Sequence, residues 1–471
     1  MMRYRLSKDD ADVAVLLQRQ CGVNIERRCG GNGKCGNCRI DLISGRWLVS
    51  GREIDAPCKG ILACRSHLVS EFGEVDVPQV LMDFAVCEDV APRGKPFPLA
   101  KEPVIAIDLG STTVVGALVR DGRIERQMSA LNRQAALGAD VMSRITYCQK
   151  EGESGVRKLR DLAIATLRDI LKALDCKKIK RIVVAGNTVM SCLLHGVDPS
   201  PIGVYPFNAP RLSFDDVSAD SMGFECDAVV STVPCVSGFI GGDIVSGLLA
   251  CPLQSGEALL DVGTNCEMVF NANGVLLATS AAAGPAFEGG TGGFTIRAIP
   301  GAVSHVGDGA MSVIGDCTPI GLCGSGVIDY LALRKRQGLL KSNGQFADGR
   351  KNDDLNGLWI PSDGIQQIQL AKAAVFSGIK MLERKGGIPC RMLYLGGLFG
   401  EHLDIANARA IGMLPEVDTV ALGNTSLQGT LMLACNPALM ELAKELSGRV
   451  STFNLSEQPN YERLFTEGLK L

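Results

Sequence analysis

The 471-residue sequence contains no apolar run of about 18 residues, the length that a helix needs to span a bilayer. It also lacks a large excess of one charge, since 48 lysines and arginines stand against 51 aspartates and glutamates, for a net charge of −3. This balance gives no electrostatic reason to bind nucleic acid or anionic lipid. The first residues hold no apolar segment typical of a secretory signal. We therefore expect a cytoplasmic protein whose partners include neither nucleic acid nor a membrane.

Histidine is scarce, with four residues, whereas cysteine is abundant, with 18. Seven cysteines fall within the first 87 residues, and the other eleven are scattered singly through apolar segments. Scattered thiols without an export signal are typical of a reducing compartment and do not indicate a disulfide framework. The length is sufficient for two or three domains with cores of their own.

The N-terminal cysteines have the spacing of an iron–sulfur loop. Five residues separate Cys29 from Cys35, two separate Cys35 from Cys38, and 25 separate Cys38 from Cys64. Plant-type [2Fe–2S] loops follow the order C-x4-C-x2-C with a distant fourth cysteine, so this spacing differs by one residue. A structural zinc site prefers two cysteine knuckles or added histidines, and His67 is the only histidine nearby. The pattern favours a [2Fe–2S] cluster over zinc or four unrelated buried thiols.

Cys58 competes with Cys64 as the fourth ligand. We favour Cys64 because residues 71–77, a strand-like segment that would close a small β-domain, follow it. Residues 3–6 and 39–43 are also predicted strands, and residues 10–19 are a predicted helix capped by Asp9 or Asp10. Cys21 and Cys87 are expected to pack as small apolar side chains. The cluster domain is thus predicted at residues 1–86, followed by a proline-containing linker at 87–102.

Two similar hairpins are predicted beyond the linker, at residues 104–119 and 258–270. Each joins two apolar strands through a turn with an Asp-x-Gly sequence and hydroxyl or amide side chains. Backbone N–H groups and hydroxyls in such turns bind phosphate oxygens, and aspartates hold Mg²⁺ through water or orient an attacking water. Ordinary Asp-Gly hairpin turns are the alternative. The first turn holds Asp108, Gly110, Ser111, Thr112 and Thr113, and the second holds Asp261, Gly263, Thr264 and Asn265.

A third glycine-rich segment follows a predicted strand and precedes a predicted helix at residues 405–411. Glycines at this point would let the backbone lie against a flat adenine or ribose ring, although the end of a strand before a helix gives the same pattern. The residues concerned are Gly396, Gly397, Phe399 and Gly400.

These three loops occur in the order found in the acetate and sugar kinase/Hsp70/actin superfamily. Finer motifs, together with the N-terminal cysteine domain, make the chain resemble the reductive activators of corrinoid proteins over nearly its whole length. The motifs lie at residues 138–145 (GADVMSRI), 185–190 (AGNTVM), 241–243 (GGD), 321–329 (GLCGSGVID), 369–374 (QLAKAA) and 423–427 (GNTSL).

The resemblance implies an α+β ferredoxin-like (β-grasp) N-terminal domain. It also implies an α/β actin/Hsp70-like ATP-binding domain at residues 103–471, built from two duplicated RNase H-like halves at about 103–250 and 251–471. In this family, ATP drives one electron from a low-potential donor through the [2Fe–2S] cluster to a Co(II) corrinoid, which becomes Co(I) and re-enters methyl transfer. The implied cofactors are the cluster, ATP and Mg²⁺, and the implied partners are a corrinoid protein and an electron donor.

The resemblance assigns Asp108 and Asp261, with their neighbours, to the two phosphate loops and residues 396–400 to the adenosine loop. Asp243 would face the water near the γ-phosphate, with Asn187 close by, although Asp243 is also a candidate helix N-cap. Two departures stand out. A single strand precedes the ferredoxin helix where the family has two, and no extra middle domain separates the linker from residue 104, which leaves the oligomeric state open.

Two other functions remain open from the sequence. The chain could donate electrons to another low-potential metalloenzyme, as the related dehydratase activators do, although it lacks their [4Fe–4S] pattern. It could instead be a small-molecule kinase whose iron–sulfur domain senses redox state, although no sugar-reading or basic cluster lies between the loops.

Overall fold

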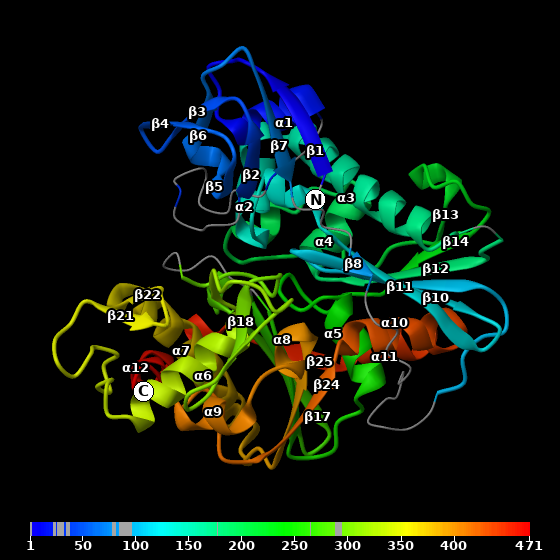
Figure 1. Cartoon of the computed structure of the whole chain (residues 1–471). Coiled ribbons are helices and arrows are strands. Elements are labelled where there is room, and N and C mark those ends of the chain that lie inside the picture. The colour runs from blue at the N-terminus through cyan, green and yellow to red at the C-terminus, as the bar shows by residue number, and fades with distance from the viewer. Residues whose placement is uncertain are drawn as a thin grey trace. The chain divides into compact units, whose positions relative to one another are not determined.

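The computed structural model describes residues 2–21, 25, 33, 38–77, 82–83, 97–176, 178–263, 265–287 and 294–471. The chain, which is drawn in Figure 1, divides into two compact units. Unit 1 comprises Met1–Val80 and Pro285–Ile368, and unit 2 comprises Leu81–Gly284 and Gln369–Leu471. Within the described residues, no helix is both long and apolar enough to cross a membrane.

The N-terminal part of unit 1 is an α+β domain with two small sheets. Helix α1 (Val13–Cys21) packs with them around a core that contains Leu16, Leu42 and Trp47. The larger sheet has the order β1-β7-β2-β5, with strands β1 (Met2–Ser7), β7 (Phe72–Val77), β2 (Arg39–Ser44) and β5 (Cys58–Leu62). The smaller has the order β4-β3-β6, with strands β4 (Arg52–Asp55), β3 (Arg46–Val49) and β6 (Ser66–Leu68).

The three strands predicted for this domain are confirmed, but the predicted helix cap is wrong. The helix begins at Val13, and Asp12 accepts a hydrogen bond from the backbone N–H of Val15 at 2.9 Å. Asp9 instead accepts from the N–H of Ala11, because its side chain closes a local turn before the helix. Residues 84–96, most of the predicted linker, lie outside the described residues, as does Cys87.

The remainder of unit 1 contains a three-stranded sheet, a helix and a hairpin. Buried Asp353 accepts hydrogen bonds from Tyr330, Arg334 and Arg350, which fixes the hairpin to the helix. The elements are β18 (Ala302–Val306), β19 (Met311–Val313), β20 (Gly321–Leu322), α6 (Gly324–Arg336), β21 (Asn352–Leu355) and β22 (Leu358–Pro361). Helix α7 (Ser362–Gly386) begins in unit 1 and continues into unit 2.

Unit 2 contains two sheets with a shared core topology. In each, three antiparallel strands follow one another along the chain, and the first of them pairs in parallel with a later strand. The first sheet has the order β13-β14-β12-β9-β10-β11-β8, and its strands are β8 (Met82–Asp83), β9 (Val104–Leu109), β10 (Thr113–Arg120), β11 (Arg123–Leu131), β12 (Arg181–Gly186), β13 (Val217–Ser218) and β14 (Val229–Thr232). The second has the order β24-β23-β15-β16-β17-β25, and its strands are β15 (Glu257–Val262), β16 (Cys266–Ala272), β17 (Val275–Ala281), β23 (Met392–Gly396), β24 (Asp418–Gly423) and β25 (Val450–Thr452).

The run β11-β10-β9-β12-β14 of the first sheet therefore matches the run β17-β16-β15-β23-β24 of the second. This repeat confirms the predicted hairpins at residues 104–119 and 258–270 and the duplicated α/β fold. We refer below to the two repeats of unit 2 as its first half, which contains the first sheet and helix α5 (Gly242–Ala250), and its second half.

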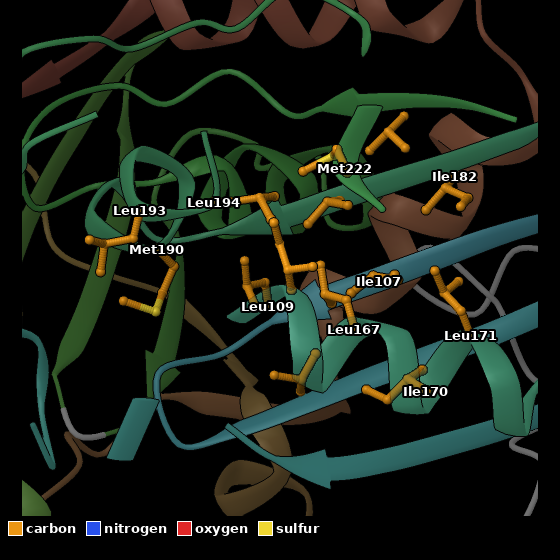
Figure 2. Close-up of a cluster of buried hydrophobic side chains, with 14 of the residues drawn as sticks. Ile107, Leu109, Leu167, Ile170, Leu171, Ile182, Met190, Leu193, Leu194 and Met222 are labelled. Carbon is orange, nitrogen blue, oxygen red and sulfur yellow. The ribbon is translucent and has the colours of Figure 1, made fainter. Parts of the chain in front are cut away.

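Helices cover both faces of the first sheet, which explains why residues 104–107 of its central strand β9 are all apolar and buried. Ile105 and Ile107 of β9 pack with α2, α3 and α4 on one face, while Val104 and Ala106 pack with α5 and α10 on the other. Figure 2 shows Ile107 in the first of these clusters, with residues of α3 and α4. The helices of unit 2 are α2 (Val141–Glu151), α3 (Glu153–Ala173), α4 (Thr188–Leu194), α5 (Gly242–Ala250), α8 (Gly397–Glu401), α9 (Ile405–Ala410), α10 (Thr425–Cys435), α11 (Leu439–Arg449) and α12 (Tyr461–Gly468). The helix predicted at 405–411 is α9.

Helices α5 and α10 come from different halves of unit 2 and cross in close contact. A Cβ atom on Gly429 of α10 would clash with the backbone carbonyl of Ser246 in α5. Gly247 of α5 likewise faces Thr425, and an added Cβ would lie 3.3 Å from the Thr425 hydroxyl. Small residues thus allow the two helix backbones to touch at this crossing.

Candidate functional site

Two of the four predicted cluster ligands are described, and their sulfurs lie together in unit 1. Cys38 directly precedes β2, and Cys64 lies in the short 3-10 helix Ala63–Arg65. The Cys38 and Cys64 sulfurs are 3.2 Å apart, and both residues are buried. The N–H of Ala63 donates to the carbonyl of Cys38 at 2.8 Å, which holds the two segments together.

This thiol pair suits a shared metal ion. Two sulfurs bound to one tetrahedral metal at about 2.3 Å lie about 3.8 Å apart, so the Cys38 and Cys64 sulfurs, at 3.2 Å, would separate by about 0.6 Å to share one metal. Within the part of the chain that the structure describes, no three His, Cys, Asp or Glu side chains gather to hold a metal. The further predicted ligands, Cys29 and Cys35, lie outside the described residues.

Gly33 of the cysteine loop is among the described residues and lies against Arg65. It adopts a φ of +71°, and an added Cβ would lie 2.9 Å from the Arg65 side chain, next to Cys64. Glycine is required here both by the left-handed backbone and by the close approach. Cys58, the competing ligand, is half-buried at the start of β5, where it packs against the hydrophobic core.

In unit 2, the aspartates of the two predicted phosphate loops occupy equivalent places in the two sheets. Asp108 lies at the carboxyl end of β9, beside Ala185 of β12, and Asp261 lies at the carboxyl end of β15, beside Gly396 of β23. A Cβ atom on Gly397 would lie 2.7 Å from an Asp261 carboxylate oxygen. The second phosphate loop and the predicted adenosine loop are therefore neighbours. Phe399 and Gly400 follow in α8.

The first phosphate loop is a tight turn held by side chains from outside it. A Cβ on Gly110 would clash with the carbonyl of Thr113, and the Asn132 amide donates to the Gly110 carbonyl at 2.9 Å. Arg144 is fully buried and donates to the carbonyls of Ser111 and Gly138. Its guanidinium also donates to the side-chain oxygen of Gln134 at 2.9 Å and to the sulfur of Met190 at 3.0 Å.

Asn187 contacts Gly241, two residues before Asp243, close to this loop. Asn187 caps α4, accepting from the N–H of Met190 at 3.0 Å, and a Cβ on Gly241 would clash with the Asn187 backbone. Gly241, not Asp243, is the N-cap of α5, so the alternative role of Asp243 as an N-cap is wrong. Asp243 lies in the first turn of that helix and accepts from the N–H of Ile244 at 2.8 Å.

The carboxylates of Asp108 and Asp243 influence one another. Both are partly accessible to solvent yet surrounded by protein. Burial, and next the negative charge of Asp108, raise the pKa of Asp243 to about 7. Burial also raises the pKa of Asp108, against hydrogen bonds from the Asn424 amide at 2.8 Å and the Ser426 hydroxyl at 2.9 Å. Paired carboxylates with raised pKa values are typical of sites that bind a cation or move a proton.

Asn424 and Ser426 had no role in the sequence-based site. Asn424 caps α10 through the N–H of Leu427, and its amide reaches across to Asp108 of the other half. The segment 423–427 was recognised as a motif, but a contact over more than 300 residues leaves no local pattern. Among the other predicted residues, Gly263 donates to the carbonyl of Asn265 at 2.9 Å, whereas Thr264 lies outside the described residues.

The fold and the two sites define a class of protein: an iron–sulfur domain fused to a duplicated actin/Hsp70-like ATP-binding domain. Three family profiles match the chain. They are described as "2Fe-2S iron-sulfur cluster binding domain" for residues 4–69, "RACo middle region" for residues 104–256, and "C-terminal domain of RACo the ASKHA domain" for residues 257–471.

Individual relatives agree with these profiles. The corrinoid activation enzyme RamQ of Eubacterium limosum is 32% identical over 439 residues, covering 82% of this chain and 72% of that one. A Co(II) methylated amine-specific corrinoid protein reductase of Methanosarcina barkeri is 23% identical over 401 residues, covering 74% and 73%. The solved structure of a reductive activator for corrinoid, iron–sulfur protein shares the fold, with a TM-score of 0.70, 23% identity and coverage of 99% and 98%. The chain belongs to the family of reductive activators of corrinoid proteins.

The family match places a [2Fe–2S] cluster in the N-terminal domain and ATP binding in the C-terminal domain. The profile described as the RACo middle region covers residues 104–256 and begins where the first predicted hairpin begins. The expectation that no extra domain separates the linker from residue 104 stays a prediction. The first phosphate loop lies within this region, which is the first half of unit 2.

Proposed function

We propose that this protein couples ATP hydrolysis to the transfer of one electron from a low-potential donor to a Co(II) corrinoid protein, which becomes Co(I). Cys29, Cys35, Cys38 and Cys64 would hold the [2Fe–2S] cluster, whose chemistry is one-electron transfer. The chain supplies two adjacent buried thiols for this role at Cys38 and Cys64. Burial keeps water away from these two ligands and so limits their reactions with solvent.

In the nucleotide site, Asp108 and Asp261 would orient water molecules around Mg²⁺, because Mg²⁺ is bound through few carboxylates and several waters. Ser111, Thr112 and Thr113, with Gly263, Thr264 and Asn265, would bind phosphate oxygens. Asp243, with its pKa near neutrality, is suited to accept a proton from the attacking water, and Asn187 lies against Gly241, two residues before it. Gly396, Gly397, Phe399 and Gly400 would receive the nucleoside.

ATP is needed because the electron moves uphill. Plant-type [2Fe–2S] clusters have potentials near about −400 mV. The Co(II)/Co(I) couple lies lower, and each deficit of about 59 mV lowers the one-electron equilibrium constant tenfold. Nucleotide binding would favour one arrangement of the two halves of unit 2. If that arrangement changes the complex with the corrinoid protein, the free energy of nucleotide binding would offset the unfavourable difference in potential.

The observation that carries the proposal is the carboxylate cluster shared by the two halves of unit 2. Asp108 and Asp243 come from the first half, and the Asn424 and Ser426 side chains that bind Asp108 come from the second. A nucleotide bound beside Asp108 would therefore act directly on the hydrogen bonds that join the two halves.

An anaerobic reduction assay tests the proposal. The protein, reduced by a low-potential donor, is mixed with a Co(II) corrinoid protein, and the Co(I) absorption is followed with and without Mg-ATP. We expect Co(I) only with ATP, and ATP turnover that rises with the corrinoid protein but not with sugars or acetate. The Asp261→Asn variant should retain its visible iron–sulfur spectrum but give no Co(I). Equal Co(I) formation without ATP, or turnover stimulated by a sugar, would contradict the proposal.

A further inference from the structure

The carbonyl groups of the first predicted phosphate loop are bound from inside the protein. The Asn132 side-chain amide donates to the Gly110 carbonyl, and the Asn132 backbone N–H donates to the Thr112 carbonyl, each at 2.9 Å. The carbonyl between these two, that of Ser111, accepts from Arg144. The C=O and N–H of a trans peptide group point in opposite directions, so the N–H groups of Ser111 and Thr112 face away from these donors. Successive N–H groups on one side of a loop suit phosphate oxygens.

The donors behind the loop converge on the sulfur of Met190. The Arg144 guanidinium lies 3.0 Å from this sulfur, and the Asn132 amide lies 3.7 Å from it. Met190 is fully buried, and so are both donor residues. A thioether sulfur is a weak hydrogen-bond acceptor, whereas a leucine side chain of similar size accepts nothing. The Met190 sulfur therefore has a polar role here in addition to filling space.

Met190 also links these donors to the segment that leads into α5. Its backbone N–H donates to the side chain of Asn187 at 3.0 Å, in the first turn of α4. Between these two residues, the Thr188 hydroxyl donates to the carbonyl of Ser237, in the segment just before α5. One residue of the 185–190 motif thus joins the support of the phosphate loop to the support of α5.

We propose that Met190 is a positioning residue of the ATPase site, whose sulfur fixes the first phosphate loop relative to Asp243 in the first turn of α5. The inference rests on the proposed function, in which this loop binds phosphate oxygens and Asp243 accepts a proton from the attacking water. Met190 acts through Asn132 and Arg144 on one side and through Asn187 on the other. Hydrolysis requires the phosphate and the proton acceptor in alignment, and a displacement of about 1 Å costs roughly 100-fold in rate.

The Met190→Leu variant removes the acceptor and keeps the side-chain size. We expect kcat for ATP hydrolysis by the full-length protein to fall at least about tenfold, because the loop shifts relative to Asp243. KM for ATP should change by less than about threefold, because the groups that bind the phosphates all remain. Steady-state ATP hydrolysis measures both quantities. Met413→Leu is the matched control, since Met413 is also fully buried, and it should change neither.

A second variant tests the same link from the side of the loop. Asn132 caps a short 3-10 helix by accepting from the N–H of Gln134 at 3.1 Å, and a serine can keep this cap but cannot replace the amide donor. We expect Asn132→Ser to lower kcat. In the double variant with Met190→Leu, the loss should be smaller than the product of the two single losses, because both substitutions remove one shared interaction.

The matched control for this second variant is Asn454→Ser. Asn454 caps another 3-10 helix by accepting from the N–H of Ser456, also at 3.1 Å, so its substitution should leave kcat unchanged.

Three outcomes would overturn the inference: a wild-type kcat in Met190→Leu, an equal loss in Met413→Leu, or single losses that multiply in the double variant. A wild-type kcat in Asn132→Ser would do so as well, which keeps the inference testable if Met190→Leu does not fold. The proposed function is judged separately, by ATP-dependent Co(I) formation and by Asp261→Asn, and it stands if only Met190→Leu behaves as the wild type.

Discussion

Asp243 carries a charge that the folded protein disfavours. Its pKa of about 7 exceeds the ordinary value of 3.8, so the folded state binds more protons than the unfolded state between these pH values. The contribution of this group to stability is therefore most favourable at low pH and declines as the pH rises to about 7. Without nucleotide, we expect the Asp243→Asn variant to exceed the wild type in free energy of unfolding at pH 8 by up to about 4 kcal/mol.

Urea denaturation at pH 5 and pH 8 measures this effect, and the gain should be smaller at pH 5. The same variant should hydrolyse ATP at least about 100-fold more slowly, because it cannot accept a proton. Substitution of the exposed Asp418 by Asn is the control and should change neither quantity. Loss of stability in Asp243→Asn at pH 8 would contradict the explanation.

Arg144 is a positioning residue for the first phosphate loop. The Arg144→Lys variant keeps the positive charge but cannot reach the Ser111 and Gly138 carbonyls, Gln134 and Met190 at once. We expect KM for ATP to rise about tenfold with a smaller change in kcat, because a lost buried hydrogen bond costs about 1–3 kcal/mol. Arg181→Lys is the matched control. Arg181 donates to the Ala434 carbonyl and lies at the amino end of β12, whereas the first predicted phosphate loop lies near its carboxyl end. Equal effects of the two substitutions would show that the role of Arg144 is general stability.

The ligand roles of Cys64 and Cys58 can be separated by parallel substitutions. We expect Cys64→Ser to lose the visible iron–sulfur spectrum, because its thiol is the one that lies against Cys38. Cys58→Ser should keep the spectrum, since this half-buried residue packs against the core. Iron and sulfide analysis after anaerobic reconstitution checks both. A cluster retained in Cys64→Ser and lost in Cys58→Ser would reverse the assignment.

At the scale of elements, the crossing of α5 and α10 depends on Gly429. The Gly429→Ala variant places a methyl group against the Ser246 carbonyl, which forces the helices apart. We expect a loss of about 1–3 kcal/mol in the free energy of unfolding, which is typical of overpacking. Gly448 of α11 has open space around it, so Gly448→Ala is a matched control and should be neutral or slightly stabilising. Equal unfolding midpoints for both variants would contradict the close crossing.

The elements around the site were predictable to different degrees. The hairpins of Asp108 and Asp261 could be predicted because continuous apolar strands and Asp-x-Gly turns are local signals. The partners of Asp108 could not, since Asn424 and Ser426 reach it only after the two halves have packed. The role of Arg144 could not be predicted either, because nothing in the local sequence distinguishes a buried arginine that binds backbone carbonyls from a surface arginine. Asp12 was missed as a helix cap because three aspartates precede the helix.

For the whole molecule, the nucleotide should stabilise unit 2 only when both halves contribute. A ligand at 100 times its Kd adds about 2.7 kcal/mol to the free energy of unfolding. We expect saturating Mg-ATP to raise the melting temperature of the wild-type protein. Asp108→Asn and Asp261→Asn should each abolish the shift, although they lie in different halves. Scanning calorimetry provides the measurement, and Asp418→Asn is the control that should keep the shift.

The contact between Gly429 and Ser246 has a mechanical consequence. The amino ends of the two crossing helices carry Asp243 on one side and Asn424 and Ser426 on the other. Where Gly429 meets Ser246, backbone touches backbone, so no side chain separates the two helices at that point. The crossing is therefore rigid. A rotation of one helix caused by nucleotide binding at its amino end would rotate the other helix as well.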